Sequence, residues 1–490
     1  MTAVKGPVPL RLRLIHGGGA VAFGVKDNGF AYFLLIYFNQ VLGMNAELVS
    51  LALLIALLVD ALVDPLLGNL SDRTYTRWGR RLPWLYAAPI PLAIAWAVLW
   101  SEPVGGPPSF LGLVGIAIVV RLLLSACEVP SISLVPEITQ DYDERTTLFR
   151  YRALAAWMGG LAMMILAYTV FMPGKEGLLE PEGYAAFGLF GAGLMAVSVI
   201  GSAIGQHRLL AHLPARRPPP FSLRLAFAEI VEAFSERAFL IFAAGALAAY
   251  ISQGMVFSIT NYLNLFVWRL TGDQLMLFPF VLFASVVLMF VIIAPLHRRM
   301  GKARAAAVSA VAGMVIGLAP YVLFLAGFWP AVGSNASTYS FYAFLLFANA
   351  LGTTAVVSAT SMIAEVVESF EERTGRRAEA SFYSGNWLIQ KCATGGGIFL
   401  TGQIIAFSGL PANAAPGSVA TGIIASFVIA FAIAGAVLGL ASAWWLARFP
   451  ISREEHEARL GRLAARRGHA SESPLDEAAR ADPEGHSIGA

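Results

Sequence analysis

Cysteine and net charge are both scarce in this sequence, and each shortage excludes a class of protein. The 490 residues include two cysteines, Cys127 and Cys392, both inside apolar segments. Two such positions cannot supply a disulfide scaffold or a CxxC metal site, so we interpret both as small core residues. The formal net charge of +3 is small and is spread along the chain, which argues against a nucleic-acid partner.

Motifs for ATP use and for hydrolysis are missing as well. The sequence has no Walker A motif, no HExxH pair and no GxSxG elbow, and its histidines lie in loops or the tail apart from His16. Direct use of ATP by this chain is therefore not expected, and no set of residues for hydrolysis is present. We predict that the protein is not an enzyme and carries no cofactor.

Apolar residues are abundant instead. Hydrophobic residues make up 57% of the chain and charged residues 13%, and the mean hydropathy is +0.67. A membrane-crossing helix needs about 20 apolar residues, and the chain offers twelve runs of this kind: 14–42, 47–71, 82–101, 108–135, 146–172, 184–206, 237–268, 275–297, 303–328, 339–367, 378–408 and 420–448. The first run is too long for the apolar core of a signal peptide and has no small-residue cleavage site after it, so it is kept as a helix.

Arginine and lysine are concentrated in every second loop. The basic positions are Arg11 and Arg13; Arg73, Arg77, Arg80 and Arg81; Arg145, Arg150 and Arg152; the segment 207–224; Arg298, Arg299 and Lys302; Arg373, Arg376 and Arg377; and Arg453. The loops between them, such as SEPVGGPPS and SGLPANAAPGS, are nearly free of basic residues. The positive-inside rule therefore places both termini in the cytoplasm, which an even number of spans also requires. We expect an integral, multi-pass protein of the plasma (inner) membrane.

The two halves of the chain repeat one another. Residues 136–146, PEITQDYDERT, align with residues 364–374, AEVVESFEERT, 228 positions later. Parallel repeats of six helices, with a binding site between them at mid-membrane, are typical of the major facilitator superfamily. We predict this all-α integral membrane fold, with twelve transmembrane helices in two six-helix pseudo-repeats. Its expected parts are an N-terminal six-helix bundle at 1–206, a cytoplasmic linker at 207–236, a C-terminal six-helix bundle at 237–450 and a largely disordered cytoplasmic tail at 451–490.

Asp60 and Asp64 are the only charged residues between positions 48 and 70. Because they are four residues apart, they share one face of a helix at bilayer depth. A carboxylate there costs about 2.5–3.5 kcal/mol on insertion scales, and two also repel each other, so something must compensate them. We predict a bound cation or a proton; the alternative is a structural pair locked to a basic residue on a neighbouring helix. The matching position of the second half is Ala294, so this site belongs to the first half only.

Ionisable residues also lie in or at the ends of other predicted spans, where such side chains face the bundle interior or a water-filled cavity. They are Lys26, Asp27, Arg121, Glu128, Arg152 and Lys391, and all are candidates for the substrate site. Arg121 and Glu128 are two turns apart on one helix face, so a mutual ion pair that fixes packing is an equally good interpretation. Lys391 has no acid nearby in its own segment. Its partner therefore comes from another helix or from the substrate, and we favour the substrate.

The loop from Gly68 to Arg81 carries a cluster of charges at the membrane surface. Its members are Asp72, Arg73, Arg77, Arg80 and Arg81. Asp72 and Arg73 could pair with the next helices in one conformational state only, and so form a gate. A loop that only anchors the topology through its arginines is equally compatible with the sequence.

Several strings in the sequence are similar to those of a known family. They are Lys26-Asp27, VDALVDP at 59–65, RWGRR at 77–81, EVPSISLVPEIT at 128–139 and RAEASFYSGNWLIQKCATGGG at 377–397. Together they resemble the glycoside–pentoside–hexuronide:cation symporters, the melibiose permease group of the major facilitator superfamily. The resemblance covers all twelve spans, and the same positions are similar to the sodium-dependent lysolipid carriers.

The resemblance implies roles for individual residues. Asp60 and Asp64 would be the cation ligands and Ser125 a hydroxyl ligand. Lys26, Asp27, Glu128 and Lys391 would match polar residues of the substrate site, and Arg152 is an approximate match displaced by one position. An asparagine between the two aspartates in the family is Val63 here, which removes one oxygen ligand. That loss favours a proton, because burial and like charge both stabilise the neutral carboxyl group, so the coupling ion is left as Na+ or H+.

The expected substrate contacts also depart from the family pattern. Two tryptophans of the sugar permease correspond to Ile132 and Val356, so a surface on which a sugar ring stacks is lost. Trp387, near Lys391, could replace one of them, which leaves a glycoside open. An aliphatic cavity with one lysine would equally suit an amphipathic anion or a lysolipid.

We therefore predict a monomeric symporter in the lipid bilayer that moves a small, glycoside-like organic solute together with Na+ or H+. The expected mechanism is alternating access, in which the two halves rock about a central site. One alternative is a cation-dependent carrier of a lysolipid or other amphipathic anion. The other is a receptor or assembly factor that is built on a transporter fold and does not transport.

Overall fold

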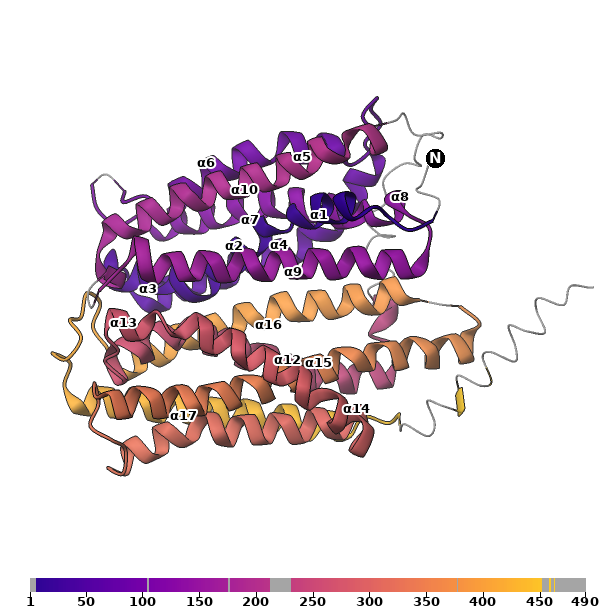
Figure 1. Cartoon of the computed structure of the whole chain (residues 1–490). Coiled ribbons are helices and arrows are strands. Elements are labelled where there is room, and N and C mark those ends of the chain that lie inside the picture. Colours follow the sequence, from indigo (N-terminus) through magenta and orange to yellow (C-terminus); the bar gives the residue numbers. More distant parts are fainter. Residues whose placement is uncertain are drawn as a thin grey trace, which may run out of the picture.

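The computed structural model describes residues 6–103, 105–174, 177–211, 231–376, 378–451, 458–459 and 462. The regular secondary structure in these ranges is helical. Figure 1 shows the helices lying side by side, with the elements up to α10 in one group and the elements from α12 to α17 in the other. Most of the predicted linker and most of the predicted tail lie outside the described residues.

Each of the first six predicted spans falls on helix. The first span consists of α1 (Leu10–Gly18), α2 (Val21–Asn28), the π-helix η1 (Gly29–Phe33), α3 (Leu34–Ile36) and the π-helix η2 (Tyr37–Val41). The next five are α4 (Ala46–Arg73); α5 (Leu82–Ala87) with α6 (Pro89–Leu99); α7 (Phe110–Ser133) with the short α8 (Val135–Ile138); α9 (Tyr142–Leu166) with the π-helix η3 (Ala167–Phe171); and, after the 3₁₀ turn η4 (Gly177–Leu179), α10 (Pro181–Leu210).

The six predicted spans of the second half also fall on helix. They comprise α12 (Arg237–Tyr262), which continues into the π-helix η5 (Leu263–Val267), then α13 (Gly272–Leu275), α14 (Phe278–Leu325), α15 (Asn335–Thr374), α16 (Glu379–Ser408) and α17 (Thr421–Leu446). α14 contains two predicted spans, which are separated by a bend at Gly301, where φ is 75°. Glycine adopts this left-handed conformation without the steric cost that a side chain would bring.

Within the described ranges, eight helices are long and apolar enough to cross a membrane. This number is smaller than the twelve predicted spans for local reasons. The first span and the α5–α6 span are broken into shorter helices, α14 contains two spans, and α16 carries polar residues such as Lys391 and Gln403. The twelve predicted runs and the observed helices therefore describe the same all-α arrangement.

Close packing between α16 and α4 joins the two halves along their length. Small residues on α16 make this approach possible: a Cβ atom on Gly395 would lie 3.0 Å from Leu54, and one on Gly402 would lie 2.0 Å from Ser50. The packing brings the middle of α16, which carries Lys391, beside the acidic face of α4.

Buried hydrogen bonds also join the halves at the end of the bundle opposite the arginine-rich loop 73–81. The Tyr168 hydroxyl donates to Asn261 Oδ1 at 2.8 Å, and Asn261 Nδ2 donates to the Tyr32 carbonyl oxygen at 2.8 Å. The Tyr262 hydroxyl donates to Asn39 Oδ1 at 3.0 Å. We call these five residues the interhalf seal.

Replacing the central member of the seal should loosen the contact between the halves. Asn261→Ala leaves the Tyr168 hydroxyl and the Tyr32 carbonyl without their partner, and a buried unpaired polar group costs about 1–3 kcal/mol. We expect a lower midpoint of thermal unfolding for the purified protein. Thr169→Val is the matched control, because the Thr169 hydroxyl bonds Ile165 within its own helix. An equal midpoint for Asn261→Ala and the control would contradict this account of the seal.

Candidate functional site

Asp60 and Asp64 on α4 both contact the side chain of Lys391 on α16. Lys391 Nζ lies 2.9 Å from Asp60 Oδ2 and also donates to Asp64 Oδ2. Because α4 belongs to the first half and α16 to the second, this ion pair crosses the boundary between the halves. It places a positive charge of the protein between the two carboxylates that the sequence predicts to hold a cation.

Asp60 has two further partners on α7. Ser125 Oγ donates to Asp60 Oδ1 at 2.6 Å, and Arg121 Nη1 lies 3.6 Å from Asp60 Oδ2. Asp60 is 2% exposed, so these contacts are made away from solvent. Neighbouring opposite charges and a donated hydrogen bond favour the ionised carboxylate, whereas burial opposes it. The predicted ligand Ser125 thus contacts Asp60 directly.

Asp64 is held differently from Asp60. Its Oδ2 atom accepts from Lys391, whereas its Oδ1 atom is buried and has no hydrogen-bond partner among the described residues. A buried carboxylate oxygen without a partner is unfavourable unless a proton, a cation or a water molecule satisfies it. Asp64 Oδ1 therefore remains available as an oxygen ligand while Lys391 contacts the pair.

A second charged cluster lies on α2 and α7. Lys26 Nζ is 3.1 Å from Asp27 Oδ1 and 3.1 Å from Glu128 Oε2. The Lys26 side chain is buried, while the Asp27 side chain is 69% exposed although it lies midway along the first predicted span. The cluster thus presents one accessible carboxylate beside a buried ammonium group.

The two arginines of the predicted substrate site have separate partners. The structure does not pair Arg121 with Glu128, since Arg121 contacts Asp60 and stacks over the Phe30 ring at 4.2 Å, while Glu128 binds Lys26. The interpretation of Arg121 and Glu128 as a mutual ion pair is therefore wrong for this conformation. Arg152 Nη1 donates to Ser131 Oγ on α7 at 2.7 Å.

Trp387 lies on α16 one helical turn before Lys391. Its side chain is 47% exposed, so it has a free face. That Trp387 replaces a family tryptophan stays a prediction.

Charges of the loop after α4 form a small network. Arg81 lies 2.6 Å from Asp72 and 3.0 Å from Glu137 of α8. Arg73 donates to Asn69 on its own helix, Arg77 stacks over the Trp78 ring at 5.6 Å, and Arg80 lies half-buried in the bend before Arg81. Of the predicted gate residues, Asp72 and Arg81 are thus brought together within the first half. Glu137, which joins them, was not among the predicted gate residues, although it stands in the repeated PEITQDYDERT motif.

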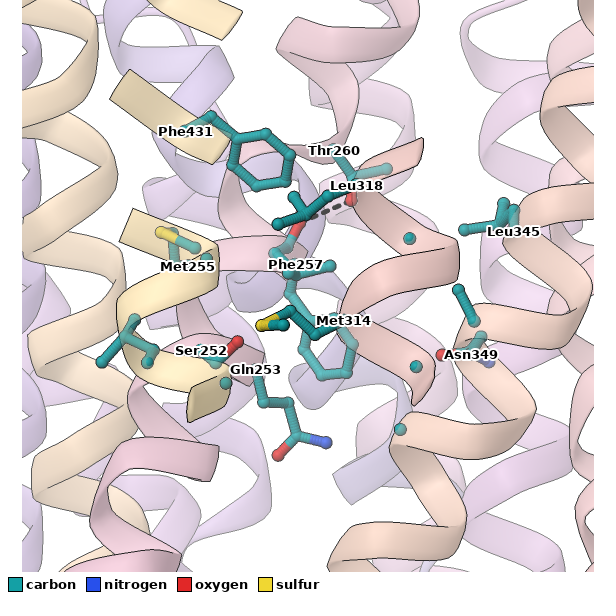
Figure 2. A pocket seen from close by; sticks show the side chains of 18 of the residues that line it. Ser252, Gln253, Met255, Phe257, Thr260, Met314, Leu318, Leu345, Asn349 and Phe431 are labelled. Carbon is teal, nitrogen blue, oxygen red and sulfur yellow. Dashed lines mark hydrogen bonds between the residues drawn. The ribbon is translucent and has the colours of Figure 1, made fainter. Parts of the chain in front are cut away.

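The second half contains an apolar cavity of about 240 Å³ between α12, α14, α15 and α17. Figure 2 shows Met255, Phe257, Met314, Leu318 and Phe431 around it. Most of the surface that lines it is apolar. Sequence reasoning missed this cavity, because its aromatic and methionine residues cannot be told from ordinary core residues by their pattern.

A family model described as MFS/sugar transport protein matches residues 15–453. The chain belongs to this family. An uncharacterized symporter of Synechocystis sp. is 26% identical, with 82% of this chain and 86% of that protein covered. The glucuronide carrier protein homolog of Escherichia coli (strain K12) is 25% identical, with 80% and 83% covered. A D-xylose-proton symporter of known structure is similar at a TM-score of 0.61 and 13% identity, over 90% of this chain and 97% of that one, which shows the fold alone.

These matches confirm the predicted family, the glycoside–pentoside–hexuronide symporters, and the major facilitator fold. The chain is an integral, multi-pass membrane protein and a symporter of small solutes. Its relatives and structural neighbours are membrane transporters rather than enzymes.

Replacing Lys391 should destabilise the protein, because Asp60 and Asp64 then lose their partner. Lys391→Met keeps the length of the side chain but leaves the buried Asp60 carboxylate and the half-buried Asp64 carboxylate without this partner. Breaking a fully buried pair costs about 3–5 kcal/mol, which is the upper end of what we expect here. In the double variant Lys391→Met, Asp64→Asn we expect much of the loss to be regained, since one uncompensated charge is gone. Thermal unfolding of the two single variants and the double variant gives the coupling energy. Additive effects would show that Lys391 and Asp64 do not depend on each other.

Proposed function

We propose that this protein is a cation-coupled symporter that moves a glycoside-like solute with Na+ or H+ by alternating access. The observation that carries the proposal is the contact of Lys391 with Asp60 and Asp64, beside the unpartnered Oδ1 atom of Asp64. Two carboxylates one turn apart, with Ser125 beside them, offer the oxygen ligands that a hard monovalent cation prefers.

Coupling follows from competition for the same carboxylates. Lys391 and Arg121 already balance the charge of Asp60 and Asp64, so an incoming cation or proton weakens the hold of the pair on Lys391. The released ammonium group then becomes available to an oxygen-rich solute. Each ligand changes the affinity for the other, which is the thermodynamic requirement for coupled transport.

The solute would bind next to this pair, where Asp27, Lys26 and Glu128 supply hydrogen-bonding charges. The positive-inside rule places the arginine-rich loop 73–81 on the cytoplasmic side. The interhalf seal then lies on the outer side, so the outer path between the halves is closed in this conformation. Transport would require the seal to open while the cytoplasmic ends of the halves close.

A second candidate is a cation-dependent carrier of a lysolipid or another amphipathic anion. The apolar cavity of the second half favours it, because a purely polar sugar gains little from such a wall. Competition by lysolipids but not by glycosides would select this candidate.

The aspartate pair gives the direct test of coupling. The purified protein is reconstituted into proteoliposomes. A Na+ gradient and a pH gradient are then imposed separately, and uptake of radiolabelled glycosides is measured under each. We expect Asp60→Asn, Asp64→Asn to abolish accumulation against a gradient, because neutral amides no longer favour a cation.

Glu47→Gln is the matched control, since Glu47 is an exposed acid in the first turn of the same helix. It should accumulate solute as the unaltered protein does. Continued uphill transport by the double variant would rule out coupling through Asp60 and Asp64. Comparison of the two gradients decides between Na+ and H+.

A further inference from the structure

The π-helix η1 contacts both the charges around Asp60 and the interhalf seal. It spans Gly29–Phe33 within the first predicted span, with α-helix on either side. A π-helical turn is rare and usually occurs as a single bulge in an α-helix, often at a functional site. Two residues of this turn, Phe30 and Tyr32, make the contacts that connect the two places.

The ring of Phe30 carries the guanidinium group of Arg121. Arg121 Cζ lies 4.2 Å from the centroid of this ring, and Arg121 Nη1 lies 3.6 Å from Asp60 Oδ2, which is longer than a hydrogen bond. Arg121 Nε is buried and has no hydrogen-bond partner among the described residues. Phe30 is 4% exposed, and a cation is held more strongly by an aromatic face away from water. The position of Arg121 is therefore set by the charge of Asp60 and by the Phe30 ring.

Tyr32, two residues after Phe30, belongs to the interhalf seal. Its carbonyl oxygen accepts from Asn261 Nδ2 at 2.8 Å. Its ring packs against Phe257 and Phe278 of the second half, with centroids 5.1 Å and 5.9 Å apart. Because the backbone of η1 supplies the acceptor, this hydrogen bond lasts only while η1 keeps its position.

Trp96 of α6 supports η1 on its other side. A Cβ atom on Gly29 would lie 2.7 Å from Trp96 Cη2, and the rings of Phe30 and Trp96 have centroids 5.8 Å apart. Trp96 is 0% exposed, so η1 cannot move toward α6 without displacing a buried ring. A shift of Phe30 is therefore taken up elsewhere along η1, where Tyr32 lies.

We infer that Phe30 is a positioning residue that couples Asp60 to the interhalf seal through Arg121 and η1. A cation that binds Asp60 repels the guanidinium group of Arg121 and ends its ion pair with the aspartate. Arg121 then leaves the Phe30 ring, η1 loses the contact that holds it, and the bond between Tyr32 and Asn261 opens. By linkage, an open seal raises the affinity of Asp60 for a cation by the same factor. This inference rests on the proposed function, in which Asp60 binds the coupling cation.

Fixed substitutions test this coupling without any ion. Asp60→Asn ends the ion pair with the arginine, as a bound cation would. Spin labels at two exposed outer positions, Glu182→Cys on α10 and Ala336→Cys on α15, report the separation of the halves by pulsed electron spin resonance. The purified full-length protein is used, with Cys127 and Cys392 replaced by alanine. We expect Asp60→Asn to raise the ratio of outer-open to outer-closed protein about tenfold, a usual size for coupling between two sites.

Phe30→Leu shows whether this response passes through the ring. The variant should itself shift the population toward the open state, and the addition of Asp60→Asn should shift it no further. Phe30→Tyr keeps an aromatic face for Arg121, so it should keep the closed state and the tenfold response. A role of Phe30 in packing alone would give additive shifts and no such rescue.

Phe38→Leu is the matched control. Phe38 is a buried phenylalanine of the same predicted span that packs against Tyr37, with ring centroids 5.1 Å apart. Its replacement removes aromatic packing but leaves the Arg121 contact, so Asp60→Asn should keep its tenfold response in this background. Arg121→Met removes the contact from the other side and serves where Phe30→Leu does not fold. In Arg121→Met, Asp60→Asn should produce no further opening.

Three outcomes would overturn the inference: an unchanged separation in Asp60→Asn, additive shifts with Phe30→Leu or Arg121→Met, or an equal loss of response in Phe38→Leu. The separation is measured without a gradient or a solute, so failure of cation-coupled uptake leaves the result intact. Conversely, uphill uptake can depend on Asp60 and Asp64 while the seal responds independently of Phe30. In that case the inference fails and the proposed function stands.

Discussion

The ion pair between Lys391 and the two aspartates of α4 is the contact on which the rest of this structure depends. Two acids at bilayer depth are unfavourable alone, and the small residues of α16 let a lysine of the opposite half reach them. The pair therefore does two things: it compensates buried charge and it holds the halves together at mid-length. Because the same carboxylate oxygens serve both purposes, any change in their charge state also changes the contact between the halves. A transporter needs this link between ion occupancy and the position of its halves.

The sequence predicts the acidic face of α4 because helical spacing is a local property. It also shows that Lys391 needs a partner from another helix or from the substrate. The substrate is the partner that the sequence favours, whereas in this structure Asp60 and Asp64 supply the contact, since neighbouring helices are chosen by tertiary packing. The same limit explains why Arg121 and Glu128 do not pair, although a mutual ion pair is one of the two interpretations that the sequence allows. Seven residues along a helix separate two side chains by about 10 Å along the axis, and α2 and α4 bring closer partners to each.

Uncharged polar residues leave almost no signal in the hydropathy pattern of the sequence. Asn261 and Asn264 lie in a run that is still apolar on average, so hydropathy marks the span but not the seal or the buried Asn264 amide, which has no hydrogen-bond partner among the described residues. The π-helical turns at Gly29–Phe33, Tyr37–Val41 and Leu263–Val267 are likewise invisible in the pattern, although such turns are frequent at functional sites. Two asparagines within four residues of one span are the signal that could have drawn attention to this end.

Comparison of the two repeats shows where they have diverged. At the arginine-rich end the pattern is kept: Arg81 lies 3.0 Å from Glu137 in the first half, and Lys302 lies 3.0 Å from Glu365, the aligned residue, in the second. At mid-membrane it is lost, since Val356 stands where the first half has Glu128. Rocking motions need equivalent contacts at the ends of both halves, whereas recognition of an asymmetric solute needs different walls at the centre. The different residues at this central position therefore give the two halves different walls, one with a carboxylate and one aliphatic.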